Sequence, residues 1–318
     1  MTTWPDRGVH EGVLETAYHG LVAASASGLK LLAKRSPAHL RWQLDHGSEP
    51  REVFRVGTLS HLVFLEPHRI EDRLLLCPLD ATGERLDKRS NAAKAEWAEA
   101  EARAEQESRV IVTPGDLRMI LGMARALQGH STARSYLAAP GPRELSLRWL
   151  DPEFDVECKA RYDLLCPAIG AVVDLKFVED ASPVGMGKHI ADWGYDISAA
   201  WYLDAAAHVG LDADEFRLIC IEKKPPHAIA VYPIYGAILA LGRRDARAAL
   251  ARYATCAQTG VWPAYGDGEL EPVYPGWMWR QRNAMDLLIG DGASAAVIAD
   301  DHDDHQEIEE GGLEDVDF

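Results

Sequence analysis

The fold of this chain is decided by one stretch of sequence, Cys158-Lys-Ala-Arg-Tyr-Asp-Leu-Leu-Cys-Pro-Ala-Ile-Gly-Ala-Val-Val-Asp-Leu-Lys176. Two strand-forming runs lie on either side of residues 167–170, which have the proline and glycine of a tight turn. The stretch therefore predicts a β-hairpin in which Cys166 pairs with Ala171.

The register of this hairpin brings three charged side chains together. Counted outward from the turn, Asp163 faces Asp174, and directly paired residues share a face of the sheet. Lys176 lies two residues beyond Asp174 and so shares that face as well. The alternative without a function is a hairpin whose charged side chains lie on a solvent-exposed face. It is weakened because Asp174 follows Ala-Val-Val and precedes Leu in an apolar strand.

Two facing carboxylates repel each other unless a cation lies between them. Oxygen ligands favour Mg²⁺, with Mn²⁺ as an alternative, and such an ion polarises a phosphoryl oxygen and activates a bound water. Lys176 would then orient or deprotonate the attacking water and stabilise the developing charge. Asp163, Asp174 and Lys176 are therefore the predicted catalytic residues.

Helices are predicted before the hairpin and on both sides of the strands that follow it. The pattern indicates helices near residues 25–35, 37–45, 54–65, 88–107, 114–128, 190–208 and 236–258. Strands are expected near residues 69–77, 144–150, 156–165, 171–178, 216–222 and 228–235. Residues 1–20 read as an irregular lead-in. The order predicts an α+β domain, in which helices flank a mixed, mostly antiparallel central sheet.

Composition bounds the class of protein. The net charge of −17 argues against nucleic-acid binding, although ten acids and no Lys or Arg lie in residues 300–318, so the rest carries −7. None of the five cysteines has CxxC spacing, which excludes a zinc-ribbon pattern. No apolar run reaches the roughly 18 residues of a membrane span, and residues 1–10 show no secretory signal. We expect a cytoplasmic protein.

Several segments together resemble the RecE-type exonucleases of the PD-(D/E)xK nuclease superfamily. The acid, then Asp-x-Lys, of the hairpin matches the superfamily pattern, with Tyr162 in place of the usual proline. The other matching segments are Ser25-Ala-Ser-Gly-Leu-Lys30, Ser36-Pro-Ala-His39, Gly57-Thr-Leu-Ser-His61, Gly194 to Asp204, Glu222-Lys-Lys-Pro-Pro-His227 and Gly260-Val-Trp-Pro-Ala-Tyr265. The resemblance covers about residues 20–280. It implies that His61 joins Asp163 and Asp174 as a metal ligand.

Further residues are candidates for support of the site or for contact with DNA. Tyr195, Ser198 and Tyr202 share one helix face. The family pattern has Gln at the position of Ser198, so serine puts full activity in doubt. The other candidates are Glu144, Arg161 and Glu222. For Glu144 the alternative is a surface carboxylate.

The resemblance implies an Mg²⁺-dependent exodeoxyribonuclease that resects linear double-stranded DNA from 5′ to 3′. It implies a single-strand annealing protein as partner and a ring-shaped homo-oligomer around DNA. Two alternatives stay open. One is a RecB- or Cas4-like nuclease of other polarity, although the Cas4 cysteine cluster is missing. The other is a non-catalytic DNA-end-binding accessory protein of recombination.

We expect a single nuclease domain over residues 1–290 and an acidic, disordered tail over residues 291–318.

Overall fold

The computed structural model describes residues 6–47 and 52–273. Contacts divide the chain into Met1–Tyr265 and Gly266–Phe318. The predicted boundary at residue 290 and the acidic tail lie outside the described residues, so both stay predictions. The part of the chain that is described holds no helix long and apolar enough to cross a membrane.

A six-stranded mixed sheet forms the centre of the first unit, in the order β1-β4-β5-β6-β7-β8. Its strands are β1 (Gly8–His10), β4 (Arg143–Asp151), β5 (Val156–Cys166), β6 (Ala171–Val178), β7 (Glu215–Glu222) and β8 (Ile229–Pro233). β6 and β7 run parallel, and every other neighbouring pair is antiparallel. The predicted α+β class with a mixed, mostly antiparallel sheet is confirmed.

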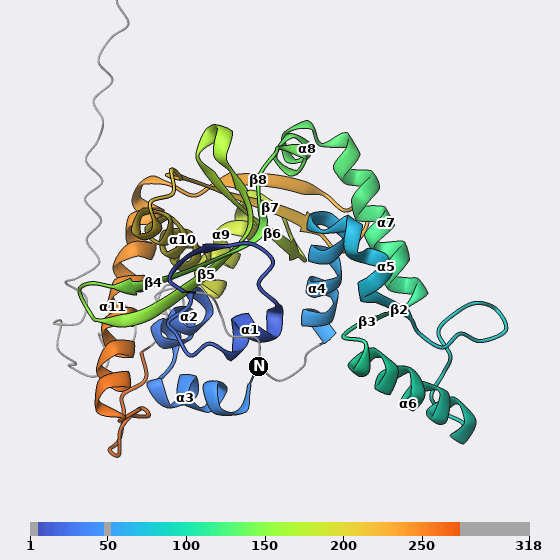
Figure 1. The fold of residues 1–318 in the computed structure, drawn as a ribbon, viewed down its shortest axis with the longest axis horizontal. Helices are drawn as coiled ribbons and strands as arrows, with labels where there is room; N and C mark the ends of the chain where they lie inside the picture. Colours follow the sequence, from blue (N-terminus) through green and yellow to red (C-terminus); the bar gives the residue numbers. More distant parts are fainter. Residues whose placement is uncertain (1–5, 48–51, 274–318) are drawn as a thin grey trace, which may run out of the picture. The chain divides into compact units, whose positions relative to one another are not determined.

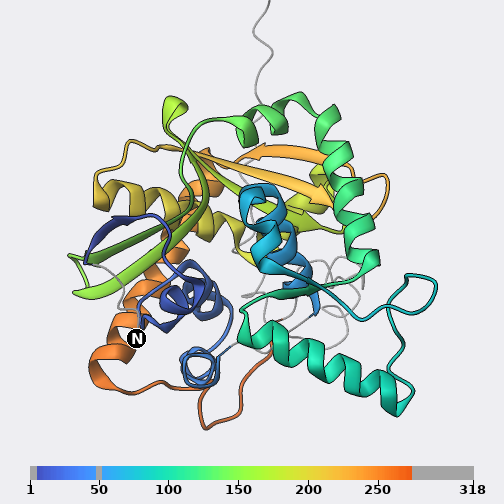
Figure 2. The same ribbon diagram turned by 45° about the vertical axis from the view of Figure 1, so that its right-hand side comes forward.

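The sheet forks between β5 and β6. Their ladder has three pairs, begins at Cys166–Ala171 as predicted, and ends at Leu164–Val173. Beyond that point β5 stays paired with β4 and β6 with β7, so two wings of the sheet separate. Figures 1 and 2 show β4 and β5 leaving the other strands. The predicted pairing of Asp163 with Asp174 is not part of the ladder, because these are the first residues past the fork.

The turn of the hairpin is a short 3-10 helix, Pro167–Ile169, followed by Gly170 in the left-handed region with φ +60°. The φ of proline is fixed near the helical value, and glycine adopts positive φ without a Cβ clash. These two residues set where the ladder starts and so fix its register.

Helices cover both faces of the sheet. They are α1 (Glu15–Gly20), α2 (Ala26–Lys34), α3 (Pro37–His46), α4 (Glu52–Leu65), α5 (Ile70–Arg73), α6 (Asn91–Gln106), α7 (Pro114–Gly129), α8 (Ser131–Ala138), α9 (Pro183–Trp193), α10 (Tyr195–Val209) and α11 (Gly236–Thr259). One core packs α2, α10 and α11 against β4, β5 and one face of β6 and β7. The second core packs α4, α7 and α8 against the other face of β6 and β7. The two sets of helices are separated in Figure 1.

Three sequence expectations differ from the structure. The helix predicted over 190–208 is two helices, because Gly194 ends α9 in the left-handed region with φ +63°. The strand predicted over 69–77 is largely helix α5, and only β2 (Leu74–Leu76) is extended. β2 pairs with β3 (Val110–Val112) in a separate two-stranded parallel sheet. The lead-in contains β1 and α1, whose shortness leaves no periodic signal.

The N-terminal lead-in covers the polar face of the β4–β5 wing. The buried Lys159 ammonium donates hydrogen bonds to the carbonyl oxygens of Tyr18 at 2.7 Å and Leu21 at 2.6 Å. The guanidinium of Arg161 donates to the Val13 carbonyl at 2.8 Å and lies over the Tyr18 ring. These side chains hold the lead-in against the sheet.

Gly242 tests the packing that positions α10. A Cβ added there would overlap the backbone carbonyl of Asp196, at the start of α10, which cannot move like a flexible side chain. We expect Gly242→Ala to lower the free energy of unfolding by roughly 1–3 kcal/mol in thermal or denaturant unfolding. Gly187→Ala is the control, because the Cβ there meets open space on exposed α9. Equal destabilisation by both substitutions would contradict this packing.

Candidate active site

Asp163 and Asp174 stand on the two sides of the fork, and both are buried. Asp163 Oδ2 accepts a hydrogen bond of 2.7 Å from the backbone N–H of Leu175. The carboxylate thus takes the place of the strand carbonyl that would have paired with this N–H. A buried N–H without a partner is costly, so Asp163 satisfies the first donor that the separating strands leave open.

Asp174 and Lys176 alternate along β6 with Val173 and Leu175, which are buried in the second core. Their side chains therefore point to the opposite face, toward α10. The Lys176 ammonium forms an ion pair with Asp174 Oδ2. It also lies 5.6 Å from the centroid of the Tyr195 ring at the start of α10. The sequence prediction that Asp174 and Lys176 share a face agrees with this geometry.

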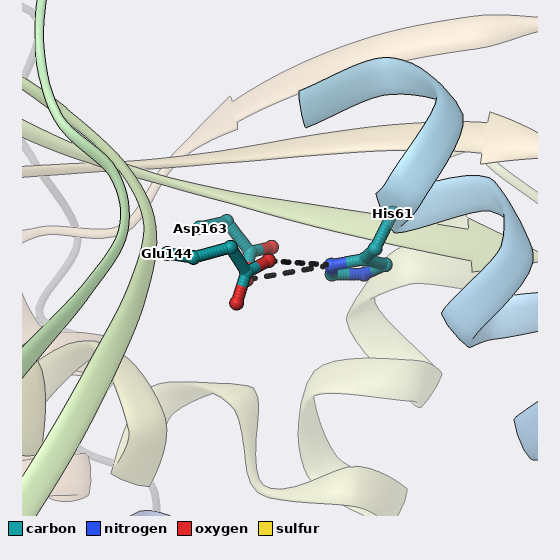
Figure 3. Close-up of side chains that lie close together, drawn as sticks. All are labelled: His61, Glu144 and Asp163. Atoms are coloured by element: carbon teal, nitrogen blue, oxygen red, sulfur yellow. Dashed lines mark ion pairs between the residues drawn. The ribbon is translucent and has the colours of Figure 1, made fainter. Parts of the chain in front are cut away.

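His61 reaches the fork from the other helix layer. Its Nδ1 lies 3.5 Å from Asp163 Oδ1 and 3.9 Å from Glu144 Oε1. Figure 3 shows the imidazole of α4 pointing at the two carboxylates of β4 and β5. The ring packs edge-on against Phe177, with centroids 5.6 Å apart. Phe177 on β6 therefore fixes the imidazole from behind, a role that the sequence analysis did not assign.

Glu144 owes its position to an irregular backbone. It lies between the paired residues Arg143–Leu164 and Leu145–Tyr162, which places it across from Asp163. Its φ of +51° is in the left-handed region, which costs a residue with a Cβ roughly 1–2 kcal/mol. Such strain persists only where the surrounding structure imposes it, and it is common at functional sites.

One ligand atom from each of His61, Glu144 and Asp163 lies within 4.8 Å of the other two. Among the described residues this is the one group of three such side chains that could hold a metal ion. The set differs from the one predicted, because Glu144 is in it and Asp174 is not. The sequence analysis had Glu144 only as a supporting residue. Its place opposite Asp163 in the antiparallel pairing of strands 144–150 and 156–165 was the signal that could have identified it.

Electrostatics of the cluster favour a bound cation. Burial, together with the nearby Asp174 carboxylate, raises the pKa of Asp163 to about 6 although the positive charges of His61 and Lys176 oppose the shift. Burial lowers the pKa of His61, but Asp163 and Glu144 outweigh it, so the net shift is upward. The pKa of Lys176 is likewise raised, because the carboxylates of Asp174 and Asp163 outweigh its burial. The carboxylates of the site therefore create a negative potential that favours a bound cation.

The donor set fits a divalent ion. Two carboxylates and one imidazole converge, and carboxylate oxygens suit Mg²⁺ and Mn²⁺, while imidazole is better suited to Mn²⁺. Only part of a six-coordinate shell comes from protein, as is usual for Mg²⁺. His61, Glu144 and Asp163 are the side chains that would hold it, with Asp174 and Lys176 beside them.

The helix face predicted to support the site does lie along it. Burial raises the pKa of Tyr202 well above its usual value, and the charges of Asp174 and Asp163 raise it further. Its backbone carbonyl accepts a hydrogen bond of 2.5 Å from the Tyr162 hydroxyl. Ser198 is buried on the same helix, one turn before Tyr202. These contacts join α10 to β5, and a role in DNA contact stays a prediction.

Two predicted residues are engaged in structural contacts. Glu222 Oε1 accepts a hydrogen bond of 2.9 Å from the Ala181 N–H, which ties the end of β7 to the loop before α9. Arg161 Nε donates to Ser146 Oγ at 3.0 Å, in addition to its contacts with the lead-in. Any further contact of either residue with DNA stays a prediction.

The raised pKa of Asp163 predicts how the stability of the metal-free protein depends on pH. A carboxyl group with a higher pKa in the folded state binds its proton more tightly there. Between the ordinary value of 3.8 and about 6, the folded protein keeps a proton that the unfolded chain has lost. The contribution of Asp163 to the free energy of unfolding therefore falls as pH rises through this window. The raised pKa of His61 acts in the same direction, because its stabilisation is lost as pH rises through the folded value.

Asp163→Asn cannot ionise, yet its amide oxygen can still accept the Leu175 N–H. We expect its unfolding free energy in EDTA to decline less from pH 4 to 7, by on the order of 1–3 kcal/mol relative to the unsubstituted chain. Glu99→Gln on exposed α6 is the control and should keep the original slope. Denaturant unfolding at a series of pH values measures this. If the unfolding free energies of Asp163→Asn and the unsubstituted chain change with pH in parallel, the pKa of Asp163 is not raised in the folded protein.

Comparisons with known proteins agree with this fold. Among proteins with curated descriptions, none matches the chain. By structure it is similar to a protein from Eubacterium rectale named "Putative exonuclease", with a TM-score of 0.53 and 13% identity over 88% of this chain and 97% of the other. A phage related exonuclease from Haemophilus somnus 129PT has 10% identity over 77% of this chain and 100% of its own, but its TM-score of 0.32 carries no argument.

The family profile described as "PDDEXK-like domain of unknown function (DUF3799)" matches residues 25–271, most of the chain. This range contains the fork, α4 with His61, and α10. The match confirms the resemblance to PD-(D/E)xK proteins that the hairpin indicated. The chain therefore belongs to the family of PDDEXK-like domains described as DUF3799.

Proposed function

We propose that this protein is a divalent-metal-dependent nuclease that hydrolyses phosphodiester bonds of DNA. The observation that carries the proposal is the convergence of His61, Glu144 and Asp163 beside the Asp174–Lys176 ion pair. An idle cluster of this kind would cost stability, because it buries carboxylates next to one another. A site for a cation and a phosphate accounts for the arrangement.

The chain's own residues have separate tasks in this reaction. The ion, held by His61, Glu144 and Asp163, would polarise the phosphoryl oxygen and lower the pKa of a water. Asp174 holds the Lys176 ammonium in place through the ion pair. Because the neighbouring carboxylates raise its pKa, Lys176 is a cation at neutral pH, suited to stabilising the charge that develops on the phosphate. This favours charge stabilisation over proton abstraction, the other role considered for Lys176.

We further propose that the substrate is the end of linear double-stranded DNA. The RecE-type resemblance supports this, as does the name of the similar Eubacterium rectale protein. Three further parts of the proposal rest on the resemblance alone. They are resection from 5′ to 3′, delivery of the 3′ strand to an annealing protein, and a ring-shaped oligomer. A ring would let an acidic protein present a basic channel to DNA.

Two substitutions at the site test the chemistry. Asp174→Asn and Lys176→Met should each reduce Mg²⁺-dependent hydrolysis of end-labelled duplex by at least about 100-fold. Lys176→Met removes the positive charge that stabilises the transition state, and Asp174→Asn removes the carboxylate that holds this ammonium in place. Glu99→Gln, remote on α6, should cleave like the unsubstituted protein. Circular dichroism checks that each variant is folded. Cleavage that survives both site substitutions would contradict the assignment of this site.

The shape of the substrate tests the requirement for ends. We expect linear duplex to be degraded while covalently closed circles of the same sequence survive, because an exonuclease must start at a terminus. Labels at the 5′ or 3′ end then report polarity. Equal rates on circles and linear DNA would indicate an endonuclease. DNA-end binding without cleavage in Mg²⁺ or Mn²⁺ would favour a non-catalytic accessory protein, to which Ser198 in place of the family Gln points.

A further inference from the structure

Lys30 on α2 is a half-buried cation beside the site, and the sequence analysis gave it no role. Its Nζ lies 5.8 Å from the centroid of the Tyr195 ring, the same ring that the Lys176 ammonium approaches to 5.6 Å. Two ammonium groups from different elements, α2 and β6, thus converge on one aromatic side chain. Like charges are not brought together in a folded protein without a gain elsewhere.

The Lys30 ammonium differs from that of the neighbouring Lys34 in its partners. Within residues 6–47 and 52–273 no carboxylate forms an ion pair with it. Lys34, one turn further along α2, contrasts with it, because that ammonium donates hydrogen bonds to the backbone carbonyls of Ala191 and Asp192. Lys34 therefore has a structural task at the end of α9, whereas the Lys30 ammonium lacks such contacts.

The electrostatic surroundings agree that Lys30 faces the site. Burial, together with the positive charge of Lys176, lowers the pKa of Lys30 to about 8, although the Asp174 carboxylate opposes the shift. The two named groups are the catalytic pair of the proposed function. A cation held in this way is stabilised when an anion enters the site.

The backbone makes room for the Lys30 side chain. Gly194, between α9 and α10, has φ +63°, and a Cβ there would lie 3.1 Å from Lys30 Cγ. The glycine is thus required both by its conformation and by the close approach of the lysine stem. α2 also packs against α10 and α11, so the position of Lys30 is set by the core rather than by a loop.

We propose that the Lys30 ammonium binds a phosphate of the DNA strand next to the one that Lys176 contacts. This inference rests on the proposed function, since it assigns Lys30 to binding substrate at the same site. Lys30 contributes to the affinity for DNA and fixes the position of the DNA strand relative to the fork between β5 and β6. It takes no proton from the reacting water. Tyr195 keeps the two ammonium groups at separate points, so that they meet different phosphates.

The test measures the binding of a short blunt duplex by fluorescence anisotropy over a salt series, with Ca²⁺ in place of Mg²⁺. Each phosphate contact that is lost reduces the slope of log K against log[salt] by about 0.9. We expect Lys30→Gln to reduce the slope by about this amount and to weaken affinity roughly ten- to hundredfold at low salt. Lys30→Arg keeps the charge and should retain the slope.

Arg35→Gln is the matched control, because it removes one positive charge from an exposed side chain at the end of the same helix. Its slope should equal that of the unsubstituted protein. A merely structural role for Lys30 would lower the midpoint of thermal unfolding and leave the slope unchanged. That result would overturn the inference.

Cleavage in Mg²⁺, measured on the same proteins, separates this inference from the proposed function. If the unsubstituted protein cleaves DNA and Lys30→Gln binds with an unchanged slope, the inference fails and the nuclease stands. If the unsubstituted protein binds without cleaving, the nuclease proposal fails, and the slope still decides whether Lys30 contacts phosphate. Absence of DNA binding in the unsubstituted protein would overturn both.

Discussion

The hydrogen bond from the Leu175 N–H to the Asp163 carboxylate is the contact on which the site depends. It closes the point where β5 leaves β6, and it satisfies a backbone donor that the separating strands would otherwise bury without a partner. The same contact holds one carboxylate oxygen in place, so the other faces His61. A fork in a sheet leaves backbone groups unpaired. Here that defect is used to place a charged side chain between the two wings of the sheet.

Both helix layers then contribute to one small volume. α4 brings His61 from the side of the second core, while α2 and α10 bring Lys30 and Tyr195 from the side of the first. A strained Glu144 adds a second carboxylate from the β4 edge of the fork. The result is a group of buried acids with cations around them, an arrangement that favours a metal ion and a phosphate over an empty site. Burying these carboxylates costs stability locally, and the packing of the two hydrophobic cores offsets that cost.

Local sequence determined the hairpin, and long-range contacts determined the metal cluster. The proline and glycine of residues 167–170 and the apolar alternation around them were enough to predict the turn and its register. His61 was identified only by resemblance, since nothing within α4 distinguishes it from a core histidine. The pairing of strands 144–150 and 156–165 could have placed Glu144 opposite Asp163, but its positive φ is not visible in a strand pattern. Lys30 was missed because it stands beside Leu29 and Leu32 in a helix that reads as ordinary and amphipathic. The break between α9 and α10 lies at Gly194, whose left-handed backbone the apolar periodicity of residues 190–208 does not record.

The central claim is that His61, Glu144 and Asp163 hold a divalent ion at the fork. The most direct measurement is anomalous X-ray diffraction from crystals of the protein soaked in Mn²⁺, with data collected on both sides of the manganese absorption edge. The claim predicts a strong anomalous peak about 2.0–2.3 Å from one atom of each of the three side chains. Asp163→Asn crystals treated in the same way should lack it. A fully occupied manganese peak elsewhere in the protein, with none among these three side chains, would contradict it.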